Sequence, residues 1–491
     1  MEHFNITLND LPDEILLIIL KNLKSFDIYY SLQGVNKRLN QIIQEEIFIK
    51  HLSFIKRSSN KFIDRLSDKT ILHRFCSQIL PSIHEKIRYL QLGSTSMKTI
   101  LHTFDYPNLD SLALFNVDEK SFRSLCKSKI LSNGLFKNQI KFLSLSCYRD
   151  EALIDMIPSM TKIFQLQVQF YDDCLYILDG RFNQLHTLII DVFNPFDLGD
   201  VENRDDLPNL KYFSFTCNWV TSFYNQTIRS LLLRMSYLER LDLYIQFGNN
   251  TTIIDGNYLK RKIINANTLR NLQEFRFSIT SRISSPVQLN LPSTKDIEQT
   301  FTHFKSKNII SCVDYFPERK EGQYHIYSYP YETKYYNDIT NKFPGGIYEY
   351  VREVSLFDEK PFEHEFFLQI QKSFPFMEIL SVKNKKAQNH KESNENLSLI
   401  QYSFLRELHI YNVHDDYIEE FLSDKKTSLS RNVNLNIKYE SLERVTNNFT
   451  REDTRINCRK VDKLYVCKGS KRCNFLEEYF PSAKIIERSR F

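Results

Sequence analysis

The chain has 491 residues, enough for two or more domains or for one long repeat array. Hydrophobic residues make up 42% of it and charged residues 25%, a balance that favours a packed core over disorder. The formal net charge of +5, from 65 basic and 60 acidic residues, gives no reason to expect nucleic acid or an anionic membrane as a partner.

The start of the chain predicts a helix with an unusual apolar run. Pro12, Asp13 and Glu14 suit a first helical turn, where a missing proline N–H is harmless and acids meet the positive helix end. Six consecutive apolar residues follow at 15–20, and Leu23 closes the helix. They cover every face, so either both sides are buried within this protein or one side awaits a partner.

Two further short helices are expected before residue 50. Ser25 can cap a second helix, whose apolar positions include Ile28 and Leu32. Gly34 interrupts that pattern, and a third helix can run over residues 35–43. A head of about forty residues buries too little surface to be stable alone, so we expect it to pack on something else.

Residues 11–43 resemble an F-box. The family's opening Leu-Pro-x-Glu is matched by Leu11, Pro12 and Glu14. The pattern continues through Ile15, Ile19, Leu20, Leu23, Asp27, Ile28, Leu32, Val35, Lys37 and Arg38. The family often has tryptophan after the basic pair, where this chain has Leu39, which keeps the site apolar.

The resemblance implies a partner. An F-box binds a Skp-type adaptor protein, which in turn joins a cullin scaffold, so one face of the first helix would pack within the F-box and the other would contact the adaptor. The alternative is an ordinary buried helix of a larger domain. The residues expected to face the adaptor or form the F-box core are Leu11, Pro12, Glu14, Ile15, Ile19, Leu20, Leu23, Leu32, Val35 and Leu39. The sequence does not separate these two roles.

A short pattern recurs beyond the head (residues 1–50) and a connector expected to be helical (51–86). It reads apolar-x-x-apolar-x-apolar and runs along residues 87–491. Its copies start at Ile87, Leu109, Ile140, Ile163, Leu185, Leu210, Leu238, Leu272, Val351, Met377, Leu405 and Val461. Such a period predicts stacked units, each a strand, a loop and usually a helix, that share one core. Residues 293–304 predict one such helix.

These units resemble leucine-rich repeats. The resemblance implies an α/β fold: a small three-helix F-box followed by a curved solenoid, with parallel strands on one face and helices and loops on the other. The family usually has Asn or Cys at the ninth position, to satisfy backbone groups in the turn. Here Asn116, Cys147, Asn384 and Asn412 stand at the eighth position and Asn218 at the ninth, so the repeat class stays open. The alternative is a generic α/β body with helices on one side of a mostly parallel sheet.

Residues 280–350 interrupt the rhythm. The tyrosine-rich stretch 324–336 is either part of degenerate repeats or a loop over one face. Its alternation of tyrosine with polar residues favours a strand over a stacking platform for single-stranded nucleic acid. The polar stretch 383–396 indicates a solvated loop.

Motifs for catalysis and for metal binding are missing. With only 11 glycines, the sequence has no glycine-rich phosphate loop and no nucleophile elbow. His364 and Glu365 begin a zinc-protease motif, but no histidine follows three residues later. Cys458, Cys467 and Cys473 lack paired metal-ligand spacing. We therefore expect no catalytic residue, no cofactor and no metal.

The cellular compartment is indicated by two further absences. The start lacks the pattern of a secretory signal, and no apolar run approaches the roughly 20 residues of a membrane span. The nine scattered cysteines are then expected to be reduced thiols in the cytoplasm, the nucleus or both.

Together these features predict the non-catalytic substrate receptor of an SCF-type ubiquitin ligase. The repeats would hold a target protein near the ubiquitin-charged enzyme, and catalysis would come from proximity. The alternative is a repeat scaffold that uses the F-box only to join the adaptor. The candidate target-binding residues, expected at outward strand positions, are Arg240, Asp242, Tyr244, Glu274, Arg276, Glu407, His409 and Tyr411. Any one of them could instead simply solvate the surface.

Overall fold

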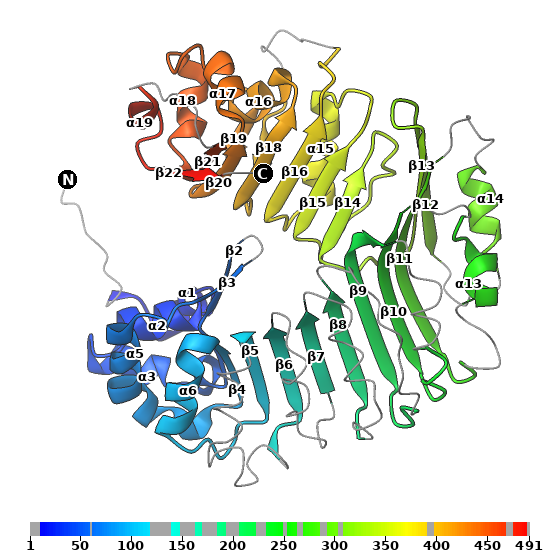
Figure 1. Ribbon diagram of the computed structural model, residues 1–491. Coiled ribbons are helices and arrows are strands. Elements are labelled where there is room, and N and C mark those ends of the chain that lie inside the picture. Colours follow the sequence, from blue (N-terminus) through cyan, green and yellow to red (C-terminus); the bar gives the residue numbers. More distant parts are fainter. Residues whose placement is uncertain are drawn as a thin grey trace. The chain divides into compact units, whose positions relative to one another are not determined.

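The structure is a computed structural model of a mixed α/β protein with a helical head and many parallel strands (Figure 1). It describes residues 10–58, 61–117, 139–147, 163–168, 184–192, 206–221, 232–248, 253–262, 269–284, 292–302, 308–389, 397–467 and 475–488. The chain divides into two compact units: Met1–Ile245 with Lys260–Phe275 form unit 1, and Gln246–Leu259 with Arg276–Phe491 form unit 2. No helix in the described ranges has the length and hydropathy of a membrane span.

The head of unit 1 contains the three predicted helices and one more short helix. They are α1 (Asp13–Lys21), α2 (Ser25–Leu32), α3 (Lys37–Ile43) and α4 (Glu46–Ile49). Ser25 is the first residue of α2, so its prediction as the cap is wrong, and its hydroxyl instead donates to the carbonyl of His51 at 3.2 Å. The helix α3 starts two residues later than predicted, because the Asn36 side chain caps it by accepting from the Leu39 N–H.

The head has a small apolar core of its own. The buried side chains come from all four helices: Leu16, Leu20, Ile28, Tyr29, Leu39, Ile42, Ile43, Phe48 and Ile49. The Tyr29 hydroxyl donates to the carbonyl of Ile43 at 2.9 Å, and burial raises the pKa of this tyrosine. Each fully buried aliphatic side chain stabilises the fold by about 1.5–3 kcal/mol, so these contacts decide whether the head folds.

The prediction of a helical connector over residues 51–86 is wrong in its first part. The alternation of exposed His51, buried Leu52 and buried Phe54 suits a strand, and β1 (His51–Ser53) pairs in parallel with β4 (Tyr89–Gly93). The hairpin of β2 (Ile55–Ser58) and β3 (Lys61–Asp64) follows, then α5 (Lys69–Arg74) and shorter turns. Only Lys50 separates α4 from β1, and its carbonyl accepts two backbone N–H groups near the start of β4.

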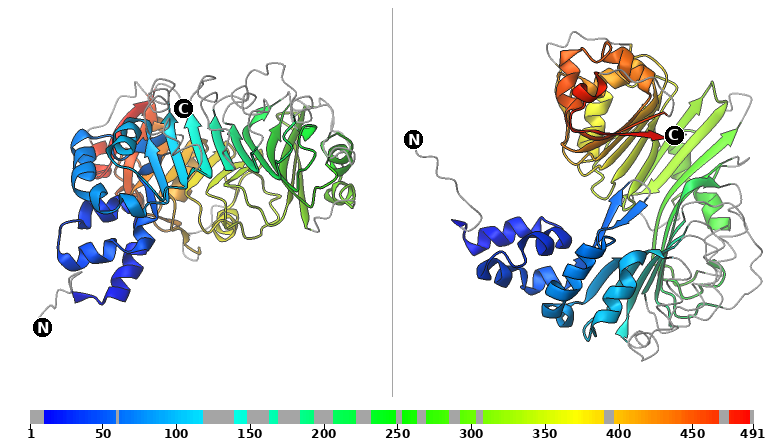
Figure 2. Two further views of the ribbon diagram at one scale, coloured as in Figure 1. Left: turned by 90° about the horizontal axis from the view of Figure 1, so that it is seen from below. Right: turned by 60° about the vertical axis from the view of Figure 1, so that its left-hand side comes forward.

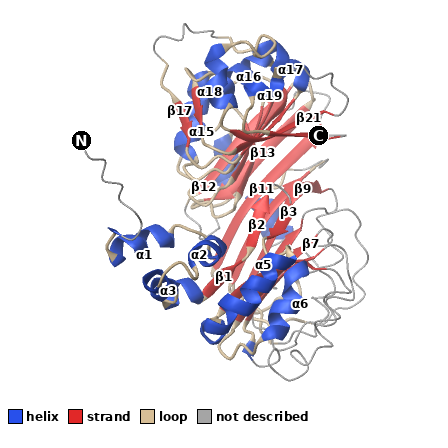
Figure 3. Ribbon diagram, turned by 90° about the vertical axis from the view of Figure 1, so that its left-hand side faces the viewer, coloured by secondary structure: helices blue, strands red, loops and turns tan. Residues whose placement is uncertain are grey.

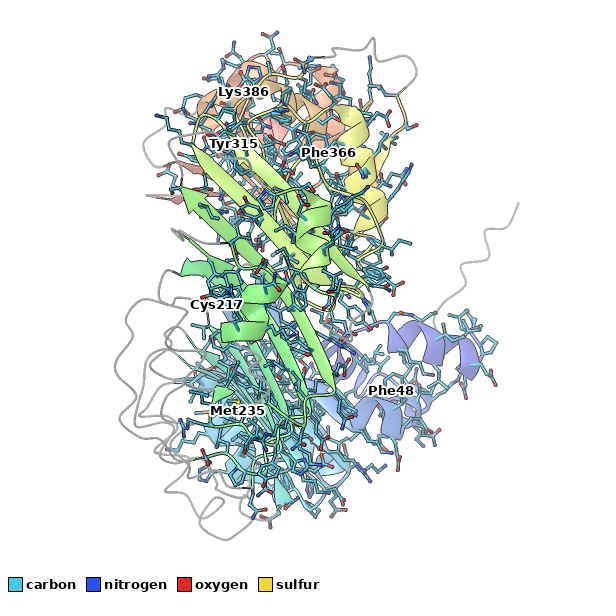
Figure 4. All side chains as sticks on the ribbon, turned by 90° about the vertical axis from the view of Figure 1, so that its right-hand side faces the viewer. Phe48, Cys217, Met235, Tyr315, Phe366 and Lys386 are labelled. Carbon is cyan, nitrogen blue, oxygen red and sulfur yellow. The ribbon has the colours of Figure 1, made fainter. Side chains whose placement is uncertain are left out.

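The main sheet of unit 1 is built from the recurring apolar pattern. Within the described ranges, the sheet has eleven strands, of which the first eight are ordered β1-β4-β5-β6-β7-β8-β9-β10, and the pairings from β1 to β9 are parallel. After β4 the strands are β5 (Ser111–Val117), β6 (Phe142–Cys147), β7 (Ile163–Val168), β8 (Thr187–Val192), β9 (Tyr212–Thr221) and β10 (Arg240–Phe247). Cys217 and Met235 belong to its buried interior (Figure 4).

The helices predicted between these strands are only partly tested. The helix α6 (Ser94–Thr103) follows β4 and buries Met97, Ile100 and Leu101. The segments that follow β5 to β9 lie largely outside the described residues. The strands of the pattern are therefore confirmed, whereas most of the returning segments of unit 1 remain a prediction.

A tight contact fixes the hairpin to the start of the sheet. The buried carboxylate of Asp64, at the end of β3, accepts hydrogen bonds from Leu66 N, Thr95 Oγ1 and Ser96 N, at 2.9, 2.5 and 3.1 Å. A Cβ atom at Gly93 would overlap the Asp64 side chain. A glycine is therefore required where β4 passes into α6.

Gly93→Ala is expected to destabilise unit 1 by about 1–3 kcal/mol, because the added methyl must displace Asp64 from its three donors. The only tryptophan of the chain, Trp219, lies in β9, so its fluorescence during urea unfolding reports on unit 1. Thr99→Ala, on the exposed side of α6, is the control and should unfold like the wild type. Equal urea midpoints of unfolding for the two variants would contradict a steric requirement for glycine at position 93.

At the interruption predicted for residues 280–350, the eleven-stranded sheet continues with antiparallel pairing. The strand β13 (Glu321–Ser328) pairs with both β11 (Glu274–Ser284) and β12 (Ile309–Phe316). The tyrosine-rich stretch lies partly in β13, which confirms the prediction of a strand. The helix predicted at residues 293–304 is shorter, α14 (Thr294–Gln299), and Ser293 and Asp296 form a capping box at its start. A further helix, α13, spans Gly256–Lys262.

In the part of the chain that the structure describes, unit 2 also contains a seven-stranded parallel sheet. Its order is β14-β15-β16-β18-β20-β21-β22, and α15 to α18 gather on one side of it (Figure 1). The strands are β14 (Tyr335–Ile339), β15 (Glu353–Phe357), β16 (Ile379–Asn384), β18 (Glu407–Val413), β20 (Val433–Ile437), β21 (Val461–Cys467) and β22 (Lys484–Arg488). The helices are α15 (His364–Ser373), α16 (Asp415–Leu422), α17 (Tyr439–Val445), α18 (Glu452–Cys458) and α19 (Leu476–Tyr479). Two short strands, β17 (Ile400–Tyr402) and β19 (Thr427–Leu429), pair with each other.

Asparagine side chains satisfy backbone groups inside unit 2. Asn457 Nδ2 donates to the carbonyls of Thr427 and Leu422 at 2.6 and 3.2 Å, while its Oδ1 accepts from Leu429 N at 3.1 Å. Asn384, at the eighth position of its repeat, donates to the Lys360 carbonyl at 2.6 Å. These bonds supply partners that buried backbone groups need.

One ion pair in unit 2 joins two helices. His364 Nδ1, at the start of α15, lies 2.6 Å from Glu420 Oε1 in α16, and His364 Nε2 lies 2.9 Å from the Ser398 carbonyl. The hydrogen bond to Glu420 raises the pKa of His364 above its ordinary value. Lys426 Nζ stands 3.7 Å from the other oxygen of the same carboxylate.

The stability of unit 2 is expected to fall as the pH rises above about 6.5. Because His364 holds its proton more tightly in the folded protein, the pair contributes fully below the ordinary histidine pKa of about 6.5 and is lost as the pH passes the raised pKa. Hydrogen exchange in α15 and α16 measures this change. His364→Gln should flatten the pH dependence, and an equally steep dependence in that variant would contradict the assignment.

Candidate functional site

The first helix presents two different apolar faces. Leu16 and Leu20 are buried, Leu16 completely, whereas the Ile18 side chain is 58% exposed. Ile15, Ile18 and Ile19 share the second face at helical spacings of three and four, and all three are exposed. In the isolated chain, this second face leaves a row of branched aliphatic groups in water.

The structure divides the predicted F-box residues by burial. Among the ten predicted F-box residues, Leu20 and Leu39 are buried in the head core, and Leu11 and Leu32 are half-buried. The exposed members are Pro12, Glu14, Ile15, Ile19, Leu23 and Val35. The predicted set omitted Leu16 and Ile18, although both lie at helical spacing from a predicted residue. Leu16 lies four residues before Leu20, and Ile18 lies three residues after Ile15. We call Pro12, Ile15, Ile18, Ile19, Leu23 and Val35 the apolar face.

The beginning of α1 is held by a basic residue of α3. Arg38 Nη2 donates to the Leu11 carbonyl at 2.6 Å, and its Nε donates to Asp13 Oδ1 at 2.7 Å. Arg38 is one of the two basic residues of the sequence pattern. These two bonds hold the start of α1 against α3 and thereby fix the direction of the apolar face.

The second helix attaches the head to the connector. Arg65 Nη1 lies 2.7 Å from Asp27 Oδ1, and the Arg65 guanidinium stands 5.0 Å from the centroid of the Phe26 ring. The guanidinium of Arg74 stands 4.9 Å from the Tyr30 ring. Two cation–π contacts and one ion pair therefore hold one side of α2. Figure 3 shows α2 between α1 and β1, and Figure 2 shows the head in two further views.

The comparisons with known proteins agree with the geometry of the head. The family model of the F-box domain matches residues 8–51. The chain therefore carries an F-box domain, and this supports its place among F-box proteins. F-box domains bind Skp-type adaptors within SCF complexes. No curated protein matches the chain.

Three of the four candidate target-binding residues of unit 1, Arg240, Asp242 and Glu274, are connected by side-chain contacts. Asp242 is only 2% exposed, and its carboxylate accepts from the Tyr212 hydroxyl at 2.7 Å and from Arg240 Nη2 at 2.9 Å. Glu274 lies 3.7 Å from Arg240, while Tyr244 is half-buried. Burial, together with the Asp242 charge, raises the pKa of Tyr212 to about 12. Its neighbours therefore cover Asp242, which offers little surface to a partner.

Most candidate target-binding residues in unit 2 also form ion pairs with other side chains. Arg276 pairs with Glu332. Glu407 is buried and offers little surface to a partner, and its carboxylate lies 3.4 Å from His409 Nε2. His409 and Tyr411 are half-buried. Of the eight candidates, the half-buried residues keep surface that a partner could contact.

The described residues hold no arrangement that indicates catalysis. Within these ranges, no group of three or more His, Cys, Asp or Glu side chains is placed to hold a metal ion. Burial raises the pKa of the Cys312 thiol to about 12 and also raises that of Cys458, which disfavours the reactive thiolate at both positions. Cys473 lies outside the described residues. The candidate functional site is the apolar face.

Proposed function

We propose that this chain is the non-catalytic substrate receptor of an SCF-type ubiquitin ligase. The observation that carries the proposal is the exposed apolar face, with Ile15, Ile18 and Ile19 of α1, inside the matched F-box domain. A Skp-type adaptor would cover this face, and through it a cullin scaffold would join. Burial of Ile15, Ile18 and Ile19 by a partner would favour binding by about 1.5–3 kcal/mol for each side chain. This gain offsets the cost of leaving the three side chains exposed to water in the isolated chain.

The body of the chain, residues 87–491, would be a set of irregular leucine-rich repeats that holds the target. Strands at the recurring pattern, their parallel pairing and the backbone bonds of Asn384 support this proposal. The candidate contacts remain Arg240, Asp242, Tyr244, Glu274, Arg276, Glu407, His409 and Tyr411. Because Asp242 and Glu407 are buried, substitution of His409 and Tyr411 separates target binding from stability better than charge reversal at the two acids.

Adaptor binding is expected to depend on the apolar face. The double variant Ile18→Asp, Val35→Asp should bind a purified Skp-type adaptor at least about 100-fold more weakly, because it removes two apolar contacts and buries two charges. Biolayer interferometry with the full-length chain measures the affinity. Ile456→Asp is the matched control, since Ile456 is an equally exposed isoleucine in α18 of unit 2. Unchanged affinity in the double variant would overturn the proposal.

Target turnover distinguishes a ligase subunit from the alternative scaffold. Proteins that co-purify with the full-length chain are expected to live longer when the proteasome is inhibited, and also when Ile18→Asp, Val35→Asp replaces the wild type. Pulse-chase measurement of their half-lives gives the answer. If neither change alters the half-lives, and the wild-type chain still binds the adaptor, the chain is a non-degradative scaffold.

A further inference from the structure

Two consecutive residues link the main sheet of unit 1 to the head. Asp64 is fixed where β4 passes into α6, by its hydrogen bonds to Thr95 Oγ1 and Ser96 N. The backbone N–H of the next residue, Arg65, donates to the Phe54 carbonyl at 2.9 Å. From this anchored backbone the Arg65 side chain extends to α2, where only 19% of it is exposed. The position of this side chain is therefore set by the sheet.

Two arginines contact a stacked pair of aromatic rings on α2. Phe26 and Tyr30 lie one helical turn apart, and their ring centroids are 5.4 Å from each other. The Arg65 guanidinium stands over the Phe26 ring, and that of Arg74, the last residue of α5, stands over the Tyr30 ring. Arg65 also forms its ion pair with Asp27. We call Arg65 and Arg74 the arginine clamp.

The arginine clamp holds α2 along its length. Lys50 is the one residue between α4 and β1, and beside this joint the hydroxyl of Ser25, the first residue of α2, donates to the His51 carbonyl. A helix that is held at one end alone can pivot about that end. The clamp adds contacts one residue and five residues further along the helix. It therefore fixes the direction of the helix axis.

The direction of α2 is passed to the apolar face through α3. The Tyr29 hydroxyl of α2 donates to the carbonyl of Ile43, the last residue of α3. In the first turn of α3, Arg38 donates to the Leu11 carbonyl and to Asp13 at the beginning of α1. Printed contacts thus connect the sheet to α2, α2 to α3, and α3 to the helix that presents the apolar face.

We propose that Arg65 and Arg74 are positioning residues, which set the direction of the apolar face relative to the first strands of the main sheet. The inference rests on the proposed function, in which a Skp-type adaptor bound to the apolar face would be held at one angle to β1 and β4. Neither arginine belongs to the apolar face, and their loss would leave the buried Leu16 and Leu20 in place. The adaptor would therefore still bind, but at a variable angle.

Double electron–electron resonance on the full-length chain bound to a purified Skp-type adaptor tests the proposal. Bio-orthogonal spin labels are placed at Gln41, which is exposed in α3, and at Thr99, which is exposed in α6. We expect Arg65→Ala with Arg74→Ala to broaden the distance distribution at least about two-fold, because α2 is then free to pivot. The adaptor should bind this variant within about two-fold of its wild-type affinity. Arg65→Lys with Arg74→Lys keeps a cation over each ring and should restore the wild-type width.

The matched control is Arg88→Ala, which removes an exposed arginine directly before β4 and should leave the distribution unchanged. An unchanged width in the double alanine variant, an equal effect of Arg88→Ala, or no recovery in the double lysine variant would overturn the inference while the proposed function stands. A loss of adaptor affinity in the double alanine variant would also overturn it, because the head would then have lost its fold. If the wild-type chain does not bind the adaptor, the proposed function fails, and this inference fails with it.

Discussion

Parallel strand pairing in register is the constraint on which the rest of the structure depends. Each copy of the apolar pattern places its buried residues against those of the preceding strand, as Leu90 and Leu112 or Leu380 and Leu408 show. The same register decides which loop residues meet at the edges of the sheets. Because the first sheet starts with β1, directly after the head, the pairing also decides how the head is attached.

The sequence predicted the elements that depend on local pattern. The head helices, the strands of the recurring motif and the strand in the tyrosine-rich stretch follow from helical or alternating spacing, and the structure confirms them. The strand β1 was missed because three residues of alternation are too short a signal. The antiparallel pairing of β13 was also out of reach, since register between distant segments leaves no local mark.

The candidate site was predicted less completely, and the reason is physical. Six apolar residues in a row give no contrast between a face that packs inward and one that stays exposed, so only the burial of Leu16 and Leu20 assigns the sides of α1. Likewise, alternation placed Asp242 outward, but the side chain that covers it, Tyr212, comes from a neighbouring strand 30 residues away. Contacts between distant residues decide both cases.

The joint at Lys50 carries a mechanical consequence. A single residue connects α4 to β1, and its carbonyl is already engaged by the start of β4, so the head has no linker on which to swing. In a receptor of the proposed kind, the head would then be attached rigidly rather than through a flexible linker. An adaptor on α1 would stand at a set angle to the first strands, and target lysines would be chosen by their distance and direction from the ubiquitin-charged enzyme.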